Sequence, residues 1–278
     1  DIGDPPIVKV TSTKTIDSLF NLQMKYEPDF IKVWYIANAT YPAEKSFPMI
    51  KYLGDLCKAK GLPLAVHATQ LKTAKLAVEA GASILVHSID DAIIDPDFVN
   101  ELKSKNVTYI PTLTVSKGYF RTFTGNYNHQ AQDLRWANPQ AYGTMMDIEH
   151  LDTAQWPRRL KQIYGYTNPS AFDAEDSIMS ANLKKLVAAG VTVATGTDAG
   201  NIGTFHASSY LAEVMAMKEA GLTNWEVITS STLDAAKGFD LEDKLGSIEK
   251  GKIADLILLN ENPLQDLSAL NEPTLVIK

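Results

Sequence analysis

The sequence predicts an α/β protein built on a parallel sheet, and three observations lead to this fold class. Short apolar runs, typical of buried strands, alternate with helical segments at close spacing. Three of these runs lead to a single polar residue: Leu64–His67, Ile84–His87 and Val193–Asp198. Polar groups at the carboxyl ends of parallel strands are how a (β/α) barrel builds an active site. The sequence therefore predicts a barrel-type sheet with functional groups along one rim.

The first part of the chain contains four of the expected strands, separated by helices. Asp95 followed by Pro96 predicts a helix start, because aspartate caps the first turn and proline suits its first position. Gly61 and Gly81 follow two other helices, where a left-handed residue commonly ends a helix. The strands are expected near 30–36, 63–67, 83–87 and 107–111, and the helices at about 15–26, after loop 37–46 up to Gly61, at 70–80 and at 95–105.

The alternation breaks after Ile110, since roughly 80 residues precede the fifth expected strand at 191–196 and one barrel unit averages ~31. The excess, about 115–170, is rich in aromatic residues and is predicted to be a lid-like insertion. Helices are expected from about 173 to 189 and from 206 to 220, and a capping box at Thr223–Glu226 opens another. From Leu245 a turn and a strand indicate a small β unit. We therefore divide the chain into a barrel portion, 1–238, and a C-terminal unit, 239–278.

Composition excludes several classes of function. Charged residues make up 21% and hydrophobic residues 45% of the chain, so disorder is not indicated. The net charge of −7 argues against a nucleic-acid or anionic-membrane partner. No apolar run reaches the ~18 residues that a transmembrane helix needs. The single cysteine, Cys57, excludes an intramolecular disulfide, and it lies in an apolar helical stripe, so we expect it to be buried. Localisation stays open.

Four polar residues at the expected strands could carry chemistry. His67 and His87 end consecutive parallel strands, so their imidazoles should converge, and neutral imidazole is a common zinc ligand. Asp198 could cap the following helix, or bind a metal and take a proton from water. Lys32 could pair with Asp29, act as a base, or react with a carbonyl compound. With carbon dioxide it would give a carbamate, an oxygen ligand able to bridge two metals.

These donors suit zinc, although manganese or cobalt could substitute. The set suggests metal-assisted hydrolysis, and Asp198 is the expected catalytic group. His206, Tyr119 and Arg121 are weaker candidates for contact with a substrate, and His150 lies in the insertion together with His129. The dinucleotide fingerprint, the phosphate-binding loop and the Gly-x-Ser-x-Gly nucleophile elbow are all missing from the sequence.

Taken in order, these residues resemble the metal-dependent amidohydrolase superfamily, in particular its imidazolonepropionase-like and prolidase-like branch. The resemblance implies a (β/α)8 barrel, of which strands four to eight lie in this chain, together with part of a small β-sandwich. It also implies Lys32 as a carbamylated bridging ligand, His67, His87 and Asp198 as further ligands, and hydrolysis of an amide or cyclic amide in a small molecule. The matching pieces are Asp29–Val33, Val66–Ala68, Leu85–Ser88, Gly196–Asn201, Lys244–Leu259 and Asn262–Leu264.

The chain departs from the family pattern in one respect. The first strand of the family ends in His-x-His, whereas none of the 5 histidines here are two residues apart. We therefore expect a C-terminal portion of a longer protein, completed by an N-terminal segment, and assembly as a homo-oligomer stays open. Two other functions stay open: a non-catalytic barrel remnant that acts as a binding or assembly module, and a lyase that uses Lys32 as a Schiff base.

Overall fold

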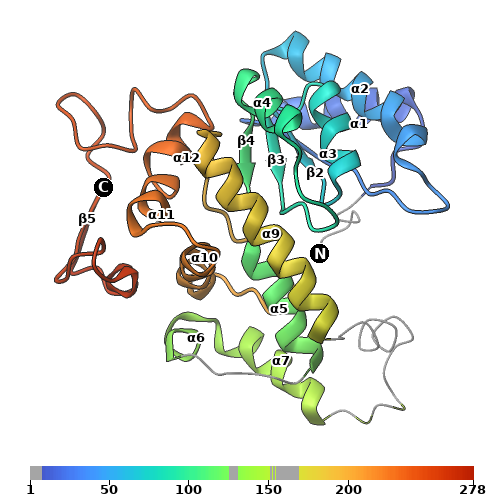
Figure 1. Cartoon of the computed structure of the whole chain (residues 1–278). Helices are drawn as coiled ribbons and strands as arrows, with labels where there is room; N and C mark the ends of the chain where they lie inside the picture. Colours follow the sequence, from blue (N-terminus) through green and yellow to red (C-terminus); the bar gives the residue numbers. More distant parts are fainter. Residues whose placement is uncertain (1–7, 125–130, 151, 153, 155–168) are drawn as a thin grey trace.

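A computed structural model of the chain describes residues 8–124, 131–150, 152, 154 and 169–278 (Figure 1). Within these ranges no helix is long and apolar enough to cross a membrane. The predicted α/β fold with parallel strands is confirmed, and its two halves differ in character. The first half alternates strands with helices, and the second half is mostly helical.

The central sheet has four parallel strands in the order β1-β2-β3-β4. The register places Trp34 opposite His67 and His67 opposite Val86, so the strands end at a common rim. Each strand joins the next through a helix, which is the arrangement that brings parallel carboxyl ends together. The strands are β1 (Ile31–Trp34), β2 (Leu64–His67), β3 (Ile84–Val86) and β4 (Thr108–Ile110).

Two of the local signals predicted for the helices of the first half are found in the structure, at Asp95 and at Gly61. Asp95 accepts a hydrogen bond from the Phe98 amide at 3.0 Å, so the predicted cap of α4 is confirmed. Gly61 has φ 68° after α2, the left-handed conformation that was predicted for it. α2 begins at Ala43, inside the segment expected to be a loop. The elements are α1 (Thr13–Gln23), η1 (Met24–Tyr26), α2 (Ala43–Lys60), α3 (Leu71–Glu79) and α4 (Pro96–Ser104).

The second half packs helices beside and beyond the sheet. α5, α6 and α7 lie past the carboxyl end of β4, and the long α9 crosses in front of α5 (Figure 1). The predicted capping box is confirmed, because Thr223 and Glu226 bond reciprocally at the start of α11. The elements are α5 (Leu113–Thr124), α6 (Ala131–Trp136), α7 (Pro139–His150), α9 (Pro169–Ala189), α10 (Ser208–Glu219), α11 (Asn224–Ser230) and α12 (Leu233–Lys237).

The fifth expected strand, at 191–196, is reduced to a single parallel bridge between Tyr109 and Val193. The Tyr109 amide donates to the Thr192 carbonyl at 2.9 Å, and the Ala194 amide donates to the Tyr109 carbonyl at 3.0 Å. The chain then turns away, since the Thr195 amide donates to the Ser230 carbonyl at the end of α11. A full strand was therefore the wrong prediction for this segment, although its pairing partner is the expected one.

The C-terminal region contains a second, separate sheet of two antiparallel strands, β5 (Leu256–Leu258) and β6 (Leu275–Ile277). The sequence indicated the first of these strands and missed the second. A short 3-10 helix, η3 (Leu267–Asn271), precedes β6 and contacts α10. Its Leu267 is buried in the main hydrophobic core, so the C-terminal region packs against the rest of the described chain at this point.

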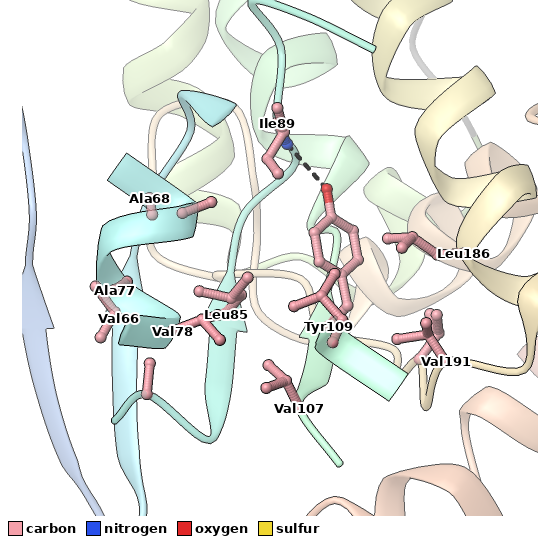
Figure 2. Close-up of a cluster of buried hydrophobic side chains, with 14 of the residues drawn as sticks. Val66, Ala68, Ala77, Val78, Leu85, Ile89, Val107, Tyr109, Leu186 and Val191 are labelled. Carbon is pink, nitrogen blue, oxygen red and sulfur yellow. Dashed lines mark hydrogen bonds between the residues drawn. The ribbon is translucent and has the colours of Figure 1, made fainter. Parts of the chain in front are cut away.

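The core lies between the sheet and its helices. Figure 2 shows Val66 and Leu85 of the sheet facing α3, and Tyr109 facing Leu186 of α9. The Tyr109 hydroxyl accepts a hydrogen bond from the Ile89 amide at 2.9 Å, drawn as the dashed line in Figure 2. Burial raises the pKa of this phenol to about 12, so it stays neutral. The bond fixes the segment that follows β3.

Candidate active site

Three predicted site residues come together at the carboxyl ends of the strands. The rings of His67, at the end of β2, and His87, just after β3, have centroids 4.5 Å apart. His87 Nε2 lies 4.0 Å from Asp198 Oδ2. Trp34, at the end of β1, places its ring 5.6 Å from that of His67. Two imidazoles and one carboxylate thus share one position at the rim.

Lys32 belongs to the same neighbourhood. It pairs in register with Ala65 of β2, two residues before His67, and its side chain is exposed. Its positive charge helps to lower the pKa of both His67 and His87, so the ammonium is close to the two rings.

Both histidines are held in the neutral form. Burial lowers the pKa of His87, and the charges of His67 and Lys32 lower it further, against the opposing effect of Asp198. Burial also lowers the pKa of His67, with Lys32 again assisting and Asp198 opposing. A neutral imidazole keeps a lone pair, which is the form that binds a metal or accepts a proton.

Each ring also has a distinct hydrogen-bonding state. His87 Nδ1 lies 2.7 Å from Thr112 Oγ1, so this nitrogen is engaged while Nε2 is the one that faces Asp198. Metal-bound histidines typically have their second nitrogen held in this way. His67 Nδ1 is buried and has no hydrogen-bond partner among the described residues. A buried polar atom without a partner costs about 1–3 kcal/mol, so it marks a place where a ligand would be stabilising.

The backbone is strained just after β3, just after β4 and just after the 191–196 segment that pairs with β4. His87 has φ 80°, Thr112 has φ 49° and Asp198 has φ 50°. Such left-handed conformations cost about 1–3 kcal/mol each for residues with a side chain, and they concentrate at functional sites. Each one turns the chain away at the rim, where a straight strand would continue past it.

Glu213 of α10 binds the backbone that directly follows the strained Thr112. Its carboxylate accepts hydrogen bonds from the backbone amides of Leu113 at 2.9 Å and Thr114 at 2.8 Å. These are the first amides of α5, directly after Thr112. The first N–H groups of an α-helix have no hydrogen-bond partner within the helix, so Glu213 supplies one. Burial raises the pKa of Glu213 to about 7. The carboxylate therefore anchors the turn that carries Thr112.

Asp198 is held by a second network. Asn201 Nδ2 donates to Asp198 Oδ2 at 3.2 Å, and the Tyr119 hydroxyl of α5 donates to Asn201 Oδ1 at 2.6 Å. The loop lies directly against α5 at Gly203, where an added Cβ would meet the Gly118 carbonyl oxygen at 2.5 Å. Only glycine fits this contact, so the loop that carries Asp198 is positioned by backbone packing as well as by hydrogen bonds.

The three residues predicted to contact a substrate are placed differently. His206 lines a cavity of about 360 Å³ between α5, α7 and the loop after Asp198. Tyr119 bonds to Asn201 beside this cavity, and Arg121 is exposed on α5. His150 is exposed at the end of α7, and His129 lies outside the described residues, as does much of the predicted lid.

The donor chemistry at the rim fits a metal ion, although the described residues are not already gathered around one. Neutral His67 and His87, an unpartnered Nδ1 and the Asp198 carboxylate are the ligand types that zinc prefers. Two ligands of one tetrahedral zinc lie roughly 3.3 Å apart, and the 4.0 Å between His87 and Asp198 is slightly wider. In the described part of the chain no group of three or more His, Cys, Asp or Glu side chains is yet close enough to hold a metal.

Thr112 and Glu213 were missed in the sequence analysis. Thr112 directly follows β4 and Pro111, so the strand-end pattern that singled out His67 and His87 should have included it. The sequence pattern around Glu213 is less specific. Glu213 is one acidic residue within an otherwise apolar stretch, Leu211–Met217, and only the structure shows what it bonds to.

A parallel α/β sheet with polar groups gathered at its carboxyl rim is the arrangement on which α/β enzymes build their sites. Residues 10–278 match the amidohydrolase family, and the chain belongs to that family. Over 79 residues it is 38% identical to the imidazolonepropionase of Porphyromonas gingivalis, covering 28% of this chain and 19% of that protein. Over 91 residues it is 35% identical to the ochratoxinase of Aspergillus niger, covering 32% of this chain and 18% of that protein.

Among solved structures, a Xaa-Pro dipeptidase with methionine in its active site superimposes with a TM-score of 0.70. The two share 23% identity over 97% of this chain and 58% of the dipeptidase. This likeness concerns the fold. The predicted resemblance to imidazolonepropionase-like and prolidase-like proteins is thereby confirmed, and the chain spans 58% of the length of that solved relative.

Proposed function

We propose that the protein containing this chain hydrolyses an amide-type C–N bond in a small molecule with the help of one or two divalent metal ions. The observation that carries the proposal is the meeting of two neutral histidines, His67 and His87, with Asp198 at the strand ends. Membership of the amidohydrolase family, which is generally metal-dependent, supports it. Zinc is the metal we expect, with manganese or cobalt as substitutes.

His67 and His87 would hold the metal through nitrogen, and Asp198 through oxygen. Lys32 would join them after reaction with carbon dioxide, because the carbamate replaces a cation with an oxygen donor. When bound, the metal polarises a carbonyl and acidifies water. Thr112 keeps His87 Nδ1 occupied, so Nε2 is the nitrogen directed to the site.

Asp198 carries the proton in the proposed reaction. It takes one proton from the attacking water as the new C–O bond forms, and gives it to the nitrogen as the C–N bond breaks. The products are a carboxylic acid and an amine. An amine leaves poorly as an anion, so this transfer is essential. Asn201, which donates to Asp198 Oδ2, keeps the carboxylate oriented during both transfers.

For the complete protein we propose a closed (β/α)8 barrel, with β1–β4 and the 191–196 segment as its strands four to eight. Among the described residues, β1 has β2 as its one strand neighbour, so its other edge is available to a further strand. The division at residue 238, with β5 and β6 as part of a small β-sandwich, belongs to the same proposal. An N-terminal segment would supply the remaining strands.

The test uses the full-length protein. Elemental analysis of the wild type, His67→Ala and His87→Ala should show metal lost in both variants, and equal content in all three would contradict the metal site. Asp198→Asn, reloaded with zinc, should lower turnover on N-acyl amino acids, dipeptides or cyclic amides by ~10²–10⁴. Near wild-type turnover with metal bound would remove the proton-transfer role. Borohydride trapping of a carbonyl substrate at Lys32 would favour a lyase instead.

A further inference from the structure

The cavity beside the Asp198 loop is large enough for a ligand group and is mainly apolar. Its volume of about 360 Å³ lies within the range of about 300–1,000 Å³ typical of small-molecule sites. Phe123 comes from α5, Met145 from α7, and Ile202 and Phe205 from the loop. No Lys, Arg, Asp or Glu is among its described lining residues. The one basic side chain among the described lining residues is that of His206, and no Lys or Arg is there to pair with an anionic group. An apolar ring would instead contact Phe123, Ile202 and Phe205.

Asn201 connects this cavity to the candidate active site. Asn201 is among the residues that line the cavity, and its side-chain amide donates to Asp198 Oδ2 at 3.2 Å. Asp198 in turn lies 4.0 Å from His87. The order His87, Asp198, Asn201, cavity places the cavity on the Asp198 side of the metal ligands. α5 and α7, which form two of its walls, lie past the carboxyl end of β4, where the rim is (Figure 1).

The walls are fixed before any ligand arrives. The Gly200 amide donates to the Thr204 carbonyl at 2.9 Å, and the Thr204 amide donates to the Asn201 carbonyl at 2.9 Å. The ring of Phe205 lies 5.4 Å from that of Tyr142 of α7, which joins the loop to the opposite wall. A preformed apolar cavity avoids the ordering cost that a flexible loop would add to binding.

We propose that this cavity binds an apolar, ring-sized substituent on the nitrogen side of the scissile bond. The side follows from the proton transfer: Asp198 delivers its proton to the departing nitrogen, and the cavity is lined by Asn201, whose side-chain amide bonds to Asp198. The substrates would then be amides of an aromatic or branched aliphatic amine. This inference rests on the proposed function for the side of the bond, and on the cavity alone for the binding of an apolar group.

Two isomeric amides test the proposal in the full-length protein. N-benzylacetamide carries its ring on the nitrogen side, and N-methyl-2-phenylacetamide carries the same ring on the acyl side. We expect the zinc-loaded wild type to hydrolyse the first with kcat/KM at least ~10-fold higher. Met145→Trp, which fills the cavity, should abolish this preference and weaken binding of N-benzylacetamide to metal-free protein at least ~10-fold, measured by ligand-observed NMR. Met146→Trp, on the same helix outside the lining, is the control.

Ala141→Leu fills the cavity from another position and serves if Met145→Trp does not fold. Unchanged binding in both filled variants would overturn the proposal, as would equal loss of hydrolysis for the two isomers. If neither isomer is hydrolysed but the filled variants lose binding while Met146→Trp keeps it, the cavity is upheld and the proposed reaction fails. If both are hydrolysed equally well in every variant, the reaction is upheld and the cavity proposal fails.

Discussion

Replacement of Glu213 by glutamine should make the stability of the protein depend on pH in a different way. Glu213 is fully buried, and the two oxygens of its carboxyl group accept hydrogen bonds from the backbone amides of Leu113 and Thr114. Burial raises its pKa from 4.5 to about 7. The folded protein therefore keeps this proton up to about pH 7, while the unfolded chain loses it near pH 4.5. The stability associated with the neutral acid is complete below pH 4.5 and is lost as the pH rises to 7.

The size of this loss follows from the two pKa values. One pKa unit corresponds to about 1.4 kcal/mol, so the complete change is about 3 kcal/mol, of which about 2–3 kcal/mol falls between pH 5 and pH 8. Glutamine does not titrate. Its carbonyl accepts one of the two amides and its NH2 group faces the other, which leaves one buried N–H unpaired at a cost of about 1–3 kcal/mol. Glu213→Gln should thus be less stable than the wild type at pH 5, with the deficit removed or reversed at pH 8.

Urea unfolding of the metal-free, full-length wild type and Glu213→Gln variant gives a free energy of unfolding for each protein. The quantity compared is the difference between the two proteins at pH 5 and again at pH 8. Other titrating groups, including Asp90, whose pKa burial raises to about 7, cancel in this difference. Glu219→Gln, on the exposed face of the same helix, is the matched control and should change stability by less than about 0.5 kcal/mol at both pH values. A Glu213→Gln deficit of the same size at pH 5 and pH 8 would refute the reasoning.

Three further changes have definite expected results. Thr112→Val keeps the side-chain shape but removes the hydroxyl that contacts His87 Nδ1, so the zinc affinity measured by chelator competition should fall ~10–100-fold. Thr112→Ser retains the hydroxyl and should retain the affinity. Equal affinities in all three proteins would contradict the role of the hydroxyl. Asn182→Ala removes hydrogen bonds to the backbone of Ile94, Ile89 and Ala92 and should lower the free energy of unfolding by about 2–4 kcal/mol. A change below about 0.5 kcal/mol would show that water replaces the amide. Burial raises the pKa of the Cys57 thiol to about 11, so a disulfide reagent at pH 8 should modify it only after unfolding, and rapid modification of native protein would count against this packing.

Much of the fold could be predicted because its signals are local. The Asp95 cap, the left-handed Gly61 and the Thr223–Glu226 capping box depend on a few neighbouring residues, and each is found as expected. The alternation of short apolar runs with helices likewise gave the four strands of the sheet within a few residues. The 191–196 segment has the same local pattern. Its strand was lost because Thr195 bonds to Ser230, a partner 35 positions away that local sequence does not reveal.

The candidate site divides in the same manner. His67, His87 and Asp198 were found from their position after apolar runs, since register alone brings such residues to one rim. Their roles as ligands stay a prediction. Thr112 and Glu213 act through contacts across 25 and 100 positions of sequence, and such pairings are set by how α5 and α10 pack. The hydrogen bonds that orient a site residue are therefore harder to predict from sequence than the residue itself.

The strain at the rim and the buried acid below it are two parts of one arrangement. His87, Thr112 and Asp198 each adopt a left-handed backbone that costs about 1–3 kcal/mol. Such conformations persist only where surrounding contacts determine them, and the described residues supply those contacts. Glu213 binds the amides that follow Thr112, Thr112 binds His87, and Asn201 binds Asp198. Because the His87 and Asp198 side chains face each other at 4.0 Å, relaxation of any one turn would separate them. The strained turns are thus held by these contacts, and they keep the His87 and Asp198 side chains facing each other.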